Sequence, residues 1–306
     1  MAPSILVLAN LAEAAEPTAR YAAVLAAPLH AHLTLLHLEM YPVMLAPELI
    51  AAATEQTERQ EAETMADLRA LAHRLPVPTE VIEMAGLMGS AVTEAVRHQQ
   101  PLLLVIGLRT EHNLLDSLLL NQVLPVLRDT HRPLLLVPPQ TGTLTLPQRV
   151  LVAVDAEPFT PNAAVRELAP LLASWSAAYT VAHVLTNDEP AASSGRLALA
   201  DVRASGLLPP DAPLDLYQEA HESPAAGILQ ALNDTQADLL VLVARPRSFF
   251  GDLFHRSVTA AVLRHCPVPV LLLPAAPETS AESVSATAAS AAQWTNGLLA
   301  GLAPAS

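Results

Sequence analysis

Residues 4–10 read Ser-Ile-Leu-Val-Leu-Ala-Asn, and residues 149–155 read Arg-Val-Leu-Val-Ala-Val-Asp. Each stretch is a short apolar run that ends on a polar residue and precedes an Ala-rich segment of helical character. Since the repeat of roughly 140 residues is too long for a solenoid, the sequence predicts a tandem duplication of one domain. Further apolar runs match in the same order at 33–38 and 179–185, at 101–108 and 238–244, and at 133–138 and 269–274.

The apolar runs alternate with helical patterns, including those at 121–128 and 257–265. Continuous runs of four to eight apolar residues are typical of strands that are buried on both faces. The sequence therefore predicts doubly wound α/β domains with mainly parallel sheets. Ligands of such sheets bind at the carboxyl ends of the strands, so the positions of interest are Asn10, Asp155, His37, His183 and the loops after Leu108 and Ala244.

The domain boundary is expected in residues 139–147, which hold turn formers and no charge. We expect one domain at 1–139 and a second at 147–276. Residues 277–306 are rich in Ala, Ser and Thr with little periodicity, and we expect a largely disordered tail there.

Composition excludes several functions. Hydrophobic residues make up 52% of the 306 residues, which is enough for buried cores. All sixteen basic residues are Arg, so no Lys is present to contact a phosphate in a P-loop or to form a Schiff base. The net charge of −14 argues against nucleic acid as a partner, because phosphate binding needs clustered cations.

Cysteine usage and hydropathy favour a reducing, aqueous compartment. Cys266 is the single cysteine, so an intrachain disulfide and a cysteine-based zinc site are excluded. The first apolar run, at 5–9, is too short for a signal peptide. The other runs fall short of the roughly 18 residues that a membrane span needs. We expect a cytoplasmic protein without a membrane partner.

Common catalytic motifs are missing: the sequence has no Gly-x-Ser-x-Gly, His-Glu-x-x-His, Gly-x-Gly-x-x-Gly or Walker A pattern. His30 and His32 would share one face of a strand and could begin a metal site, although a surface turn with two solvated imidazoles is the simpler interpretation. His265 beside Cys266 is better explained as a histidine at a helix end than as a catalytic pair. We expect no catalytic residues.

A local cationic region lies in residues 244–259, Ala-Arg-Pro-Arg-Ser-Phe-Phe-Gly-Asp-Leu-Phe-His-Arg-Ser-Val-Thr. Ser257 at a helix start beside Arg256 is a reasonable anion cradle. The alternative is a simple helix N-cap by Ser257 with solvated Arg side chains. The three Phe residues are better suited to filling a core or an interface than to stacking on bases.

The chain resembles a tandem universal stress protein, with two copies of the family's domain over residues from about 4 to 276. The resemblance depends on the opening strand, on the second strand with its late His, and on Leu-Arg-His-Cys-Pro-Val-Pro-Val-Leu-Leu-Leu at 263–273. It implies a five-stranded parallel α/β sheet in each half. Because domains of this family pair through their last strands, it also implies that the two halves form a dimer-like unit within one chain.

The family's ATP binders carry Gly-x2-Gly-x9-Gly-Ser/Thr after the fourth strand and Asp after the first, and backbone after the second strand meets adenine. On this resemblance the first half has a degenerate site, in which only the first Gly is kept, at Asn10, Leu38, Gly107, Thr110, Leu120 and Asn121. In the second half the motif positions are Ala244, Arg247, Arg256 and Ser257, in a loop one residue shorter. The nucleotide- or anion-binding candidates there are Asp155, Val184, Arg247, Arg256, Ser257 and Val258.

Side chains at positions of close backbone approach block the phosphate path and disfavour positive φ. We therefore expect a non-catalytic stress-response protein that works through contacts with an unidentified protein partner or a second copy of itself, and that needs no cofactor. The alternative is a switch that binds ATP with magnesium, or a phosphate-like anion held by Arg247 and Arg256, with slow ATP hydrolysis at most. An adenylyl-transferring enzyme has no supporting motif.

Overall fold

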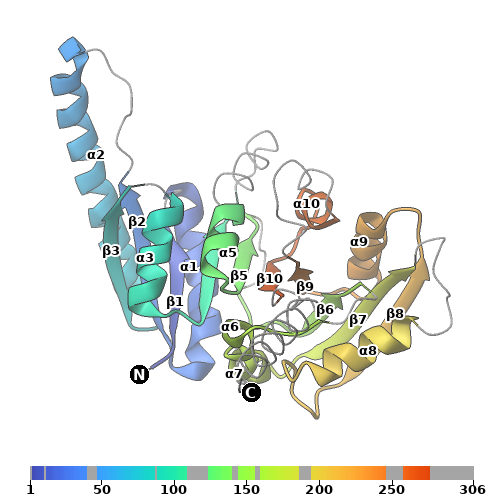
Figure 1. Ribbon diagram of the computed structural model, residues 1–306. Coiled ribbons are helices and arrows are strands. Elements are labelled where there is room, and N and C mark those ends of the chain that lie inside the picture. The colour runs from blue at the N-terminus through green and yellow to red at the C-terminus, as the bar shows by residue number, and fades with distance from the viewer. Residues whose placement is uncertain are drawn as a thin grey trace, which may run out of the picture. The chain divides into compact units, whose positions relative to one another are not determined.

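The computed structural model describes residues 2–9, 12–39, 47–86, 88–108, 123–139, 144–155, 159–185, 194–245 and 258–275. The described strands and helices form two series with the same order of strands (Figure 1). The predicted tail at 277–306 lies outside the described residues.

The first half contains five strands and four α-helices among its described residues. In chain order they are β1 (Ser4–Leu8), α1 (Ala12–Ala26), the short 3-10 helix η1 (Ala27–Leu29), β2 (His32–Glu39), α2 (Pro47–Arg74), β3 (Thr79–Ala85), α3 (Met88–Gln99), β4 (Leu103–Gly107), α5 (Leu124–Thr130) and β5 (Leu134–Val137).

The second half repeats the strands with shorter helices. In chain order the elements are β6 (Arg149–Ala153), α6 (Ala163–Arg166), α7 (Ala169–Ser174), β7 (Ala178–Leu185), α8 (Ser194–Ala204), β8 (Leu214–Ala220), α9 (Pro224–Asp234), β9 (Leu239–Ala244), α10 (Val258–Leu263) and β10 (Val270–Pro274). The expected boundary at 139–147 falls between the end of β5 and the start of β6.

The ten strands form one sheet in the order β3-β2-β1-β4-β5-β10-β9-β6-β7-β8. Pairing within each half is parallel, and the order reverses beside β1 and β6, as the prediction of doubly wound domains requires. The last strands of the two halves pair antiparallel, with Leu271 opposite Leu135. The predicted fold class is therefore confirmed, and the expected pairing of the two halves through their last strands is present.

Two apolar cores cover the two faces of the sheet, and both continue from one half into the other. The first core lies under α1, α2, α7 and α8, and the second under α3, α5, α9 and α10. Alternate residues of each strand enter opposite cores; Val7 faces the first and Leu8 the second. Burial on both faces explains why β1, β4, β6 and β9 are continuous apolar runs.

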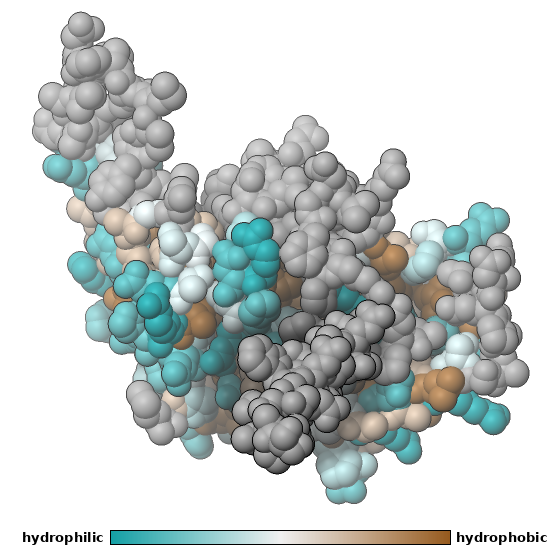
Figure 2. Space-filling model, in the orientation of Figure 1, coloured by the Kyte–Doolittle hydropathy of each residue, from teal (hydrophilic) through white to brown (hydrophobic). Residues whose placement is uncertain are grey.

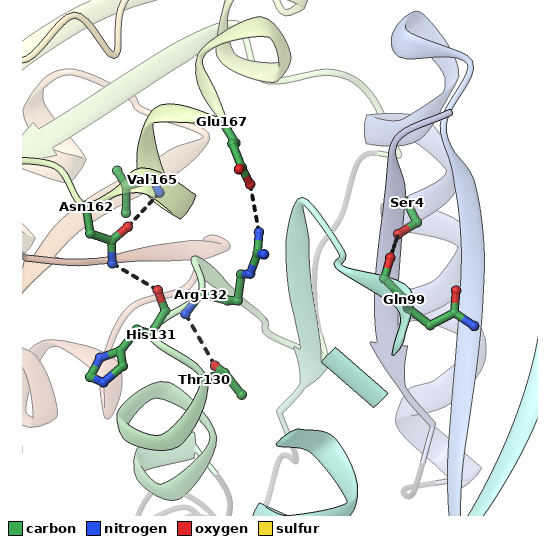
Figure 3. Close-up of polar contacts among 8 residues, drawn as sticks. All are labelled: Ser4, Gln99, Thr130, His131, Arg132, Asn162, Val165 and Glu167. Atoms are coloured by element: carbon green, nitrogen blue, oxygen red, sulfur yellow. Dashed lines mark hydrogen bonds and ion pairs between the residues drawn. The ribbon is translucent and has the colours of Figure 1, made fainter. Parts of the chain in front are cut away.

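Polar contacts join the halves beside the β5–β10 pair (Figure 3). Arg132, just before β5, donates from Nη1 to Glu167 Oε2 at 2.8 Å. The Asn162 side chain donates to the carbonyl oxygen of His131 at 3.0 Å and accepts from the Val165 N–H at 2.8 Å, so that it caps α6. Within the first half, Ser4 Oγ donates to the Gln99 carbonyl at 3.3 Å.

The outermost strands β3 and β8 are half exposed, since each mixes partly buried with exposed residues. In the orientation of Figure 2, hydrophobic residues of the described parts form separate spots among hydrophilic ones. Leu197 on α8 and Leu216 on β8 are exposed apolar side chains of the second half.

Among the helices that the structure describes, none combines the length and the apolar composition that a bilayer crossing demands.

Candidate functional site

The carboxyl ends of β6 and β9 hold an ion pair between two residues that are 90 positions apart in the chain. Arg245 donates from Nε to Asp155 Oδ2 at 2.8 Å and from Nη2 to Asp155 Oδ1 at 2.5 Å. Strands β6 and β9 are neighbours in the sheet, and β6 lies where the strand order reverses. The ion pair therefore spans the position at which doubly wound sheets bind ligands.

The two members of this pair differ in exposure. The Arg245 side chain is 9% exposed, whereas the Asp155 side chain is 52% exposed. A bidentate guanidinium–carboxylate contact is among the stronger hydrogen-bonding arrangements in proteins. Displacing Asp155 removes a partner from a buried cation, which costs several kcal/mol, whereas the carboxylate itself can be solvated at little cost.

A buried histidine lies next to the ion pair. His183 in β7 is 1% exposed, and its Nδ1 lies 3.3 Å from the carbonyl oxygen of Val154, the residue before Asp155. His37 occupies the matching position of β2 in the first half, because Leu36 and Ala182 accept equivalent backbone hydrogen bonds from Ala9 and Val154. The late His that the sequence pattern singled out in each second strand is thus a buried side chain in both halves.

The strand register corrects one step of the sequence comparison. Leu8 of β1 lies opposite Ile106 of β4, and the matching Ala153 of β6 lies opposite Leu242 of β9. Gly107 therefore corresponds to Val243, whereas sequence matching placed Ala244 there. With Val243 as the first position, the second-half loop has the full spacing, with Pro246, Arg256 and Ser257 at the remaining positions, and is not one residue shorter.

The structure describes five of the sequence-predicted candidates. Gly107 ends β4, Leu38 lies buried near the end of β2, Asp155 follows β6, Val184 is near the end of β7, and Val258 begins α10 with an exposed side chain. The others lie outside the described residues: Asn10, Thr110, Leu120, Asn121, Arg247, Arg256 and Ser257.

Arg245 is the site residue that sequence reasoning missed. From the sequence, Arg245 is only one residue of the cationic region at 244–259, and nothing there pairs it with Asp155. A signal was present, since Asp155 and Arg245 each follow a central strand, and doubly wound topology makes those two strands neighbours.

Val184 packs closely against α9. A Cβ atom added at Gly227 would lie 2.6 Å from Val184 Cγ1 and 2.9 Å from Cγ2, both too short for a real contact. Gly227 therefore lets α9 approach β7 closely. This close packing occurs at Val184, the position where the family resemblance places the contact with adenine.

An apolar cavity of about 20 Å³ lies under α7 and α8 on the face of the first core. Val154 and Val243 are among the residues that line it; Val154 directly precedes Asp155, and Val243 lies two residues before Arg245. Two hydroxyl groups lie in its wall and both donate to carbonyl oxygens, Tyr179 to Leu172 at 2.8 Å and Ser205 to Val202 at 2.6 Å. Burial raises the pKa of Tyr179 to about 12, so this hydroxyl stays protonated at neutral pH.

The other histidines and the cysteine are placed as follows. His30 precedes β2 in a left-handed conformation with φ 49°, so it does not share a strand with His32 as the sequence suggested. Within the described ranges, no group of three or more His, Cys, Asp or Glu side chains is placed to hold a metal ion. Burial raises the pKa of Cys266 to about 11, so its thiol is protonated at neutral pH, and the exposed His265 directs Nδ1 to the Ala261 carbonyl oxygen at 3.2 Å.

Comparison with known proteins supports the interpretation of the fold. A model of the universal stress protein family matches residues 1–138 and 147–274. A universal stress protein of Archaeoglobus fulgidus superposes with a TM-score of 0.66 and 18% identity over 90% of this chain and 97% of that one. A functionally unknown protein of Pseudomonas aeruginosa gives a TM-score of 0.55 and 16% identity, with 89% and 92% coverage. No curated protein matches the chain.

Proposed function

The chain belongs to the universal stress protein family, which supports a role in the stress response, and from this premise we propose that it acts there without catalysis, through contacts with other proteins, and does not bind ATP. The observation that carries the proposal is the ion pair of Arg245 with Asp155. The resemblance to the family's ATP binders assigns the Asp after the first strand to the nucleotide site. In the second half, this Asp is Asp155, and its carboxylate already binds the guanidinium of Arg245.

Competition with Arg245 makes nucleotide binding unfavourable. A nucleotide that contacted Asp155 would first have to break two charge-assisted hydrogen bonds to a side chain that is 9% exposed. The cost of leaving a buried cation with one partner fewer is of the order of 3 kcal/mol. That cost alone weakens binding by more than a hundredfold, since about 1.4 kcal/mol corresponds to a factor of ten.

The glycine positions support the same proposal. Val243 stands where Gly107 stands in the first half, and its branched side chain lines the apolar cavity. Pro246 and Arg256 replace the other two glycines of the family's motif. Proline supplies no backbone N–H to a phosphate, and none of these residues favours positive φ.

The pairing of β5 with β10 bears on protein contacts. Both last strands are occupied by each other, so a protein partner has to meet another surface. The half-exposed outer strands β3 and β8 have unpaired backbone edges in the described sheet, and such edges are common sites of strand addition. Leu197 and Leu216 are exposed apolar side chains in the α8–β8 region.

Calorimetric titration with ATP, magnesium and inorganic phosphate tests the proposal. We expect no heat of binding from ATP, with or without magnesium. Tight binding of ATP that Arg256→Glu abolishes would contradict the proposal and would support a nucleotide switch in the second half. Binding of phosphate without ATP would instead support a remodelled anion site, and Arg132→Gln, remote from the ends of β6 and β9, is the matched control for both.

A further inference from the structure

Strand β8 is the last strand of the described sheet, next to β7 and with no described strand on its other side (Figure 1). The Tyr179 N–H of β7 donates to the carbonyl oxygen of Pro213 at 2.9 Å. Because the backbone of a strand repeats every two residues, the odd-numbered residues of β8 pair with β7 and the even-numbered ones face outward. The N–H and C=O groups of Leu214, Leu216 and Ala220 therefore point along the outer edge of the sheet.

We propose that this edge of β8 binds an extended segment of a partner protein, in which cationic side chains alternate with apolar ones. The segment adds one further strand to the sheet. The inference rests on the proposed function, since it names the surface and the partner chemistry of the protein contacts inferred there. In strand addition the main chain supplies hydrogen bonds, and alternate side chains supply specificity.

One face of β8 is acidic. Asp215, Tyr217 and Glu219 alternate along the strand and share the face that α9 covers. The Tyr217 hydroxyl contacts Glu219 Oε2 and, at 2.8 Å, Asp234 Oδ2 on α9. A hydroxyl has one hydrogen, so it cannot be donated to both carboxylates at once. The Gln230 amide donates to Glu219 at 3.1 Å but carries no charge, and the face stays negative.

The segment that carries this face contains no Arg or Lys. Residues 204–244 are all described, and they include β8 and α9. Their carboxylates are Asp211, Asp215, Glu219, Glu222, Asp234 and Asp238. A strand with cationic side chains on the α9 face therefore has complementary charge, which favours both encounter and the correct register.

The opposite face of β8 favours apolar side chains. Leu216 is 36% exposed on the face that α8 covers, and its Cδ2 would lie 3.3 Å from a Cβ atom added at Gly195. Arg196 and Arg203 belong to α8, so additional cations are favoured on the α9 face only. Every second side chain of an added strand lies on the Leu216 face. The partner sequence is therefore expected to alternate cationic with apolar residues.

Two alternatives fit less well. If two copies of the chain paired antiparallel through β8, the Asp215 and Glu219 carboxylates of both would share one face, and like charges on opposed strands are destabilising. The outer edge of β3 has Glu80 and Glu83 on opposite faces, and the Thr34 hydroxyl donates to Glu80 at 3.0 Å. Only β8 has two strand carboxylates on one face.

The peptide acetyl-Lys-Val-Lys-Val-Lys-Val-amide is the probe that tests this. We expect it to slow hydrogen exchange at the Leu216 and Ala220 amides, measured by nuclear magnetic resonance, in a saturable manner. A peptide with Glu in place of each Lys removes the charge complementarity. A peptide N-methylated at every amide keeps the charges but donates no backbone hydrogen bond. Each control should bind at least about tenfold more weakly.

Variants of the two outer strands locate the contact. Asp215→Asn combined with Glu219→Gln should weaken binding of the Lys peptide about tenfold, because two opposite-charge pairs are lost. Glu80→Gln combined with Glu83→Gln makes the same change in charge on β3 and should leave binding unchanged.

A proline at the edge removes one outward N–H. Leu216→Pro should abolish the slower exchange at Ala220, whereas Val81→Pro, at an outward-facing residue of β3, should not. Circular dichroism establishes that each variant is folded, and the carboxylate variants alone decide the test if Leu216→Pro does not fold.

Three results would overturn the proposal: no binding of the Lys peptide, binding without slower exchange at Leu216 and Ala220, or equal binding of the N-methylated peptide. Full binding to the folded Asp215→Asn, Glu219→Gln chain would do the same. These outcomes are distinct from failure of the proposed function, because titration with ATP tests that function separately. A chain that binds neither ATP nor the Lys peptide overturns this inference alone.

Discussion

The two halves share one strand order but differ at the carboxyl edge of the sheet. In the second half, Arg245 and Asp155 form an ion pair, Val243 lines a cavity, and His183 Nδ1 lies near the Val154 carbonyl oxygen. The position of Val243 is Gly107 in the first half, and the His37 ring nitrogens are buried without a hydrogen-bond partner among the described residues. The apolar strands therefore determine the fold that both halves share, and a few side chains determine how the carboxyl edge of each half differs. Substitutions in either half can test this distinction.

The largest expected effect concerns the apolar core that the two halves share. Leu271 of β10 is 1% exposed opposite Leu135, in the core that continues across both halves. Leu271→Asp would bury a charge without a partner and should cost at least about 4 kcal/mol of unfolding free energy. Urea unfolding measures this, and the unmodified chain should unfold in a single transition.

Leu216→Asp is the control for this substitution, because Leu216 lies half exposed on the outer strand and should tolerate a charge within about 0.5 kcal/mol. Leu271→Ala, expected to cost about 3 kcal/mol, keeps the test valid if Leu271→Asp yields no folded protein. Two separate transitions in the unmodified chain would show that the halves fold independently.

The second prediction concerns the ion pair between Arg245 and Asp155. Among the described residues, the carboxyl edge of the sheet holds such a pair in the second half only. Asp155→Ala removes the bidentate partner of a buried guanidinium and should lower the unfolding free energy by about 3 kcal/mol. Glu167→Ala removes the partner of Arg132 between the halves, where Glu167 is 57% exposed, and should cost less than about 1 kcal/mol. Equal losses in the two variants would mean that the pair at the carboxyl edge is an ordinary surface contact.

The third prediction is a pH dependence that belongs to one half. Burial raises the pKa of Cys266 from 9.0 to about 11. Since the folded state favours the neutral thiol, this stabilisation is present below pH 9 and is lost as the pH rises from 9 to 11, amounting to about 2 kcal/mol.

Thr130 is the residue of the first half that corresponds to Cys266, so Cys266→Thr transfers the first-half residue to the second. Thermal unfolding between pH 8 and pH 11 should show a smaller alkaline loss in this variant than in the unmodified chain. An identical alkaline loss in both proteins would contradict the assignment to Cys266. Tyr179 titrates at a still higher pH and contributes equally to both proteins.

The smallest expected effect comes from exchanging the residues at one matching position of helices α3 and α9. Gly227 in α9 corresponds to Ala91 in α3, and a methyl group at Gly227 would collide with Val184. Gly227→Ala should therefore destabilise by about 1 kcal/mol, although alanine is the better helix former. Ala91→Gly should destabilise by a similar amount through helix propensity and a lost buried methyl. A stabilising Gly227→Ala would show that α9 is not pressed against β7 as described.

The sequence predicts the strands that are buried on both faces and misses those that are not. The runs at 4–10, 33–38, 101–108 and 133–138, and their partners in the second half, correspond to β1, β2, β4 and β5 and to β6, β7, β9 and β10. No run identified β3 or β8, because these outer strands are half exposed and polar residues interrupt their apolar ones. Among the described residues, α2 is 28 residues long, whereas α8 at the matching place of the second half is 11 residues long, and the sequence analysis predicted neither length.

The candidate site is only partly predictable from sequence for a physical reason. Asp155 follows directly from its place at the end of an apolar run, but its partner lies 90 residues away, and that contact exists only once β6 and β9 are neighbours. Sequence matching assigned Ala244 to the position of Gly107, one residue too far along, because the residues of an apolar run resemble one another too closely to be aligned uniquely. The backbone hydrogen bonds between neighbouring strands show the correct alignment.

The state of Arg245 in solution tests the central claim most directly. The Nε–H resonance of Arg245, assigned by its loss in Arg245→Lys, reports on the contact with Asp155 by nuclear magnetic resonance. We predict a slowly exchanging signal that moves in Asp155→Asn and is unchanged by an excess of ATP with magnesium. A signal that exchanges as fast as those of exposed arginines, or one that shifts stoichiometrically with ATP, would contradict the claim that Arg245 occupies the second-half site.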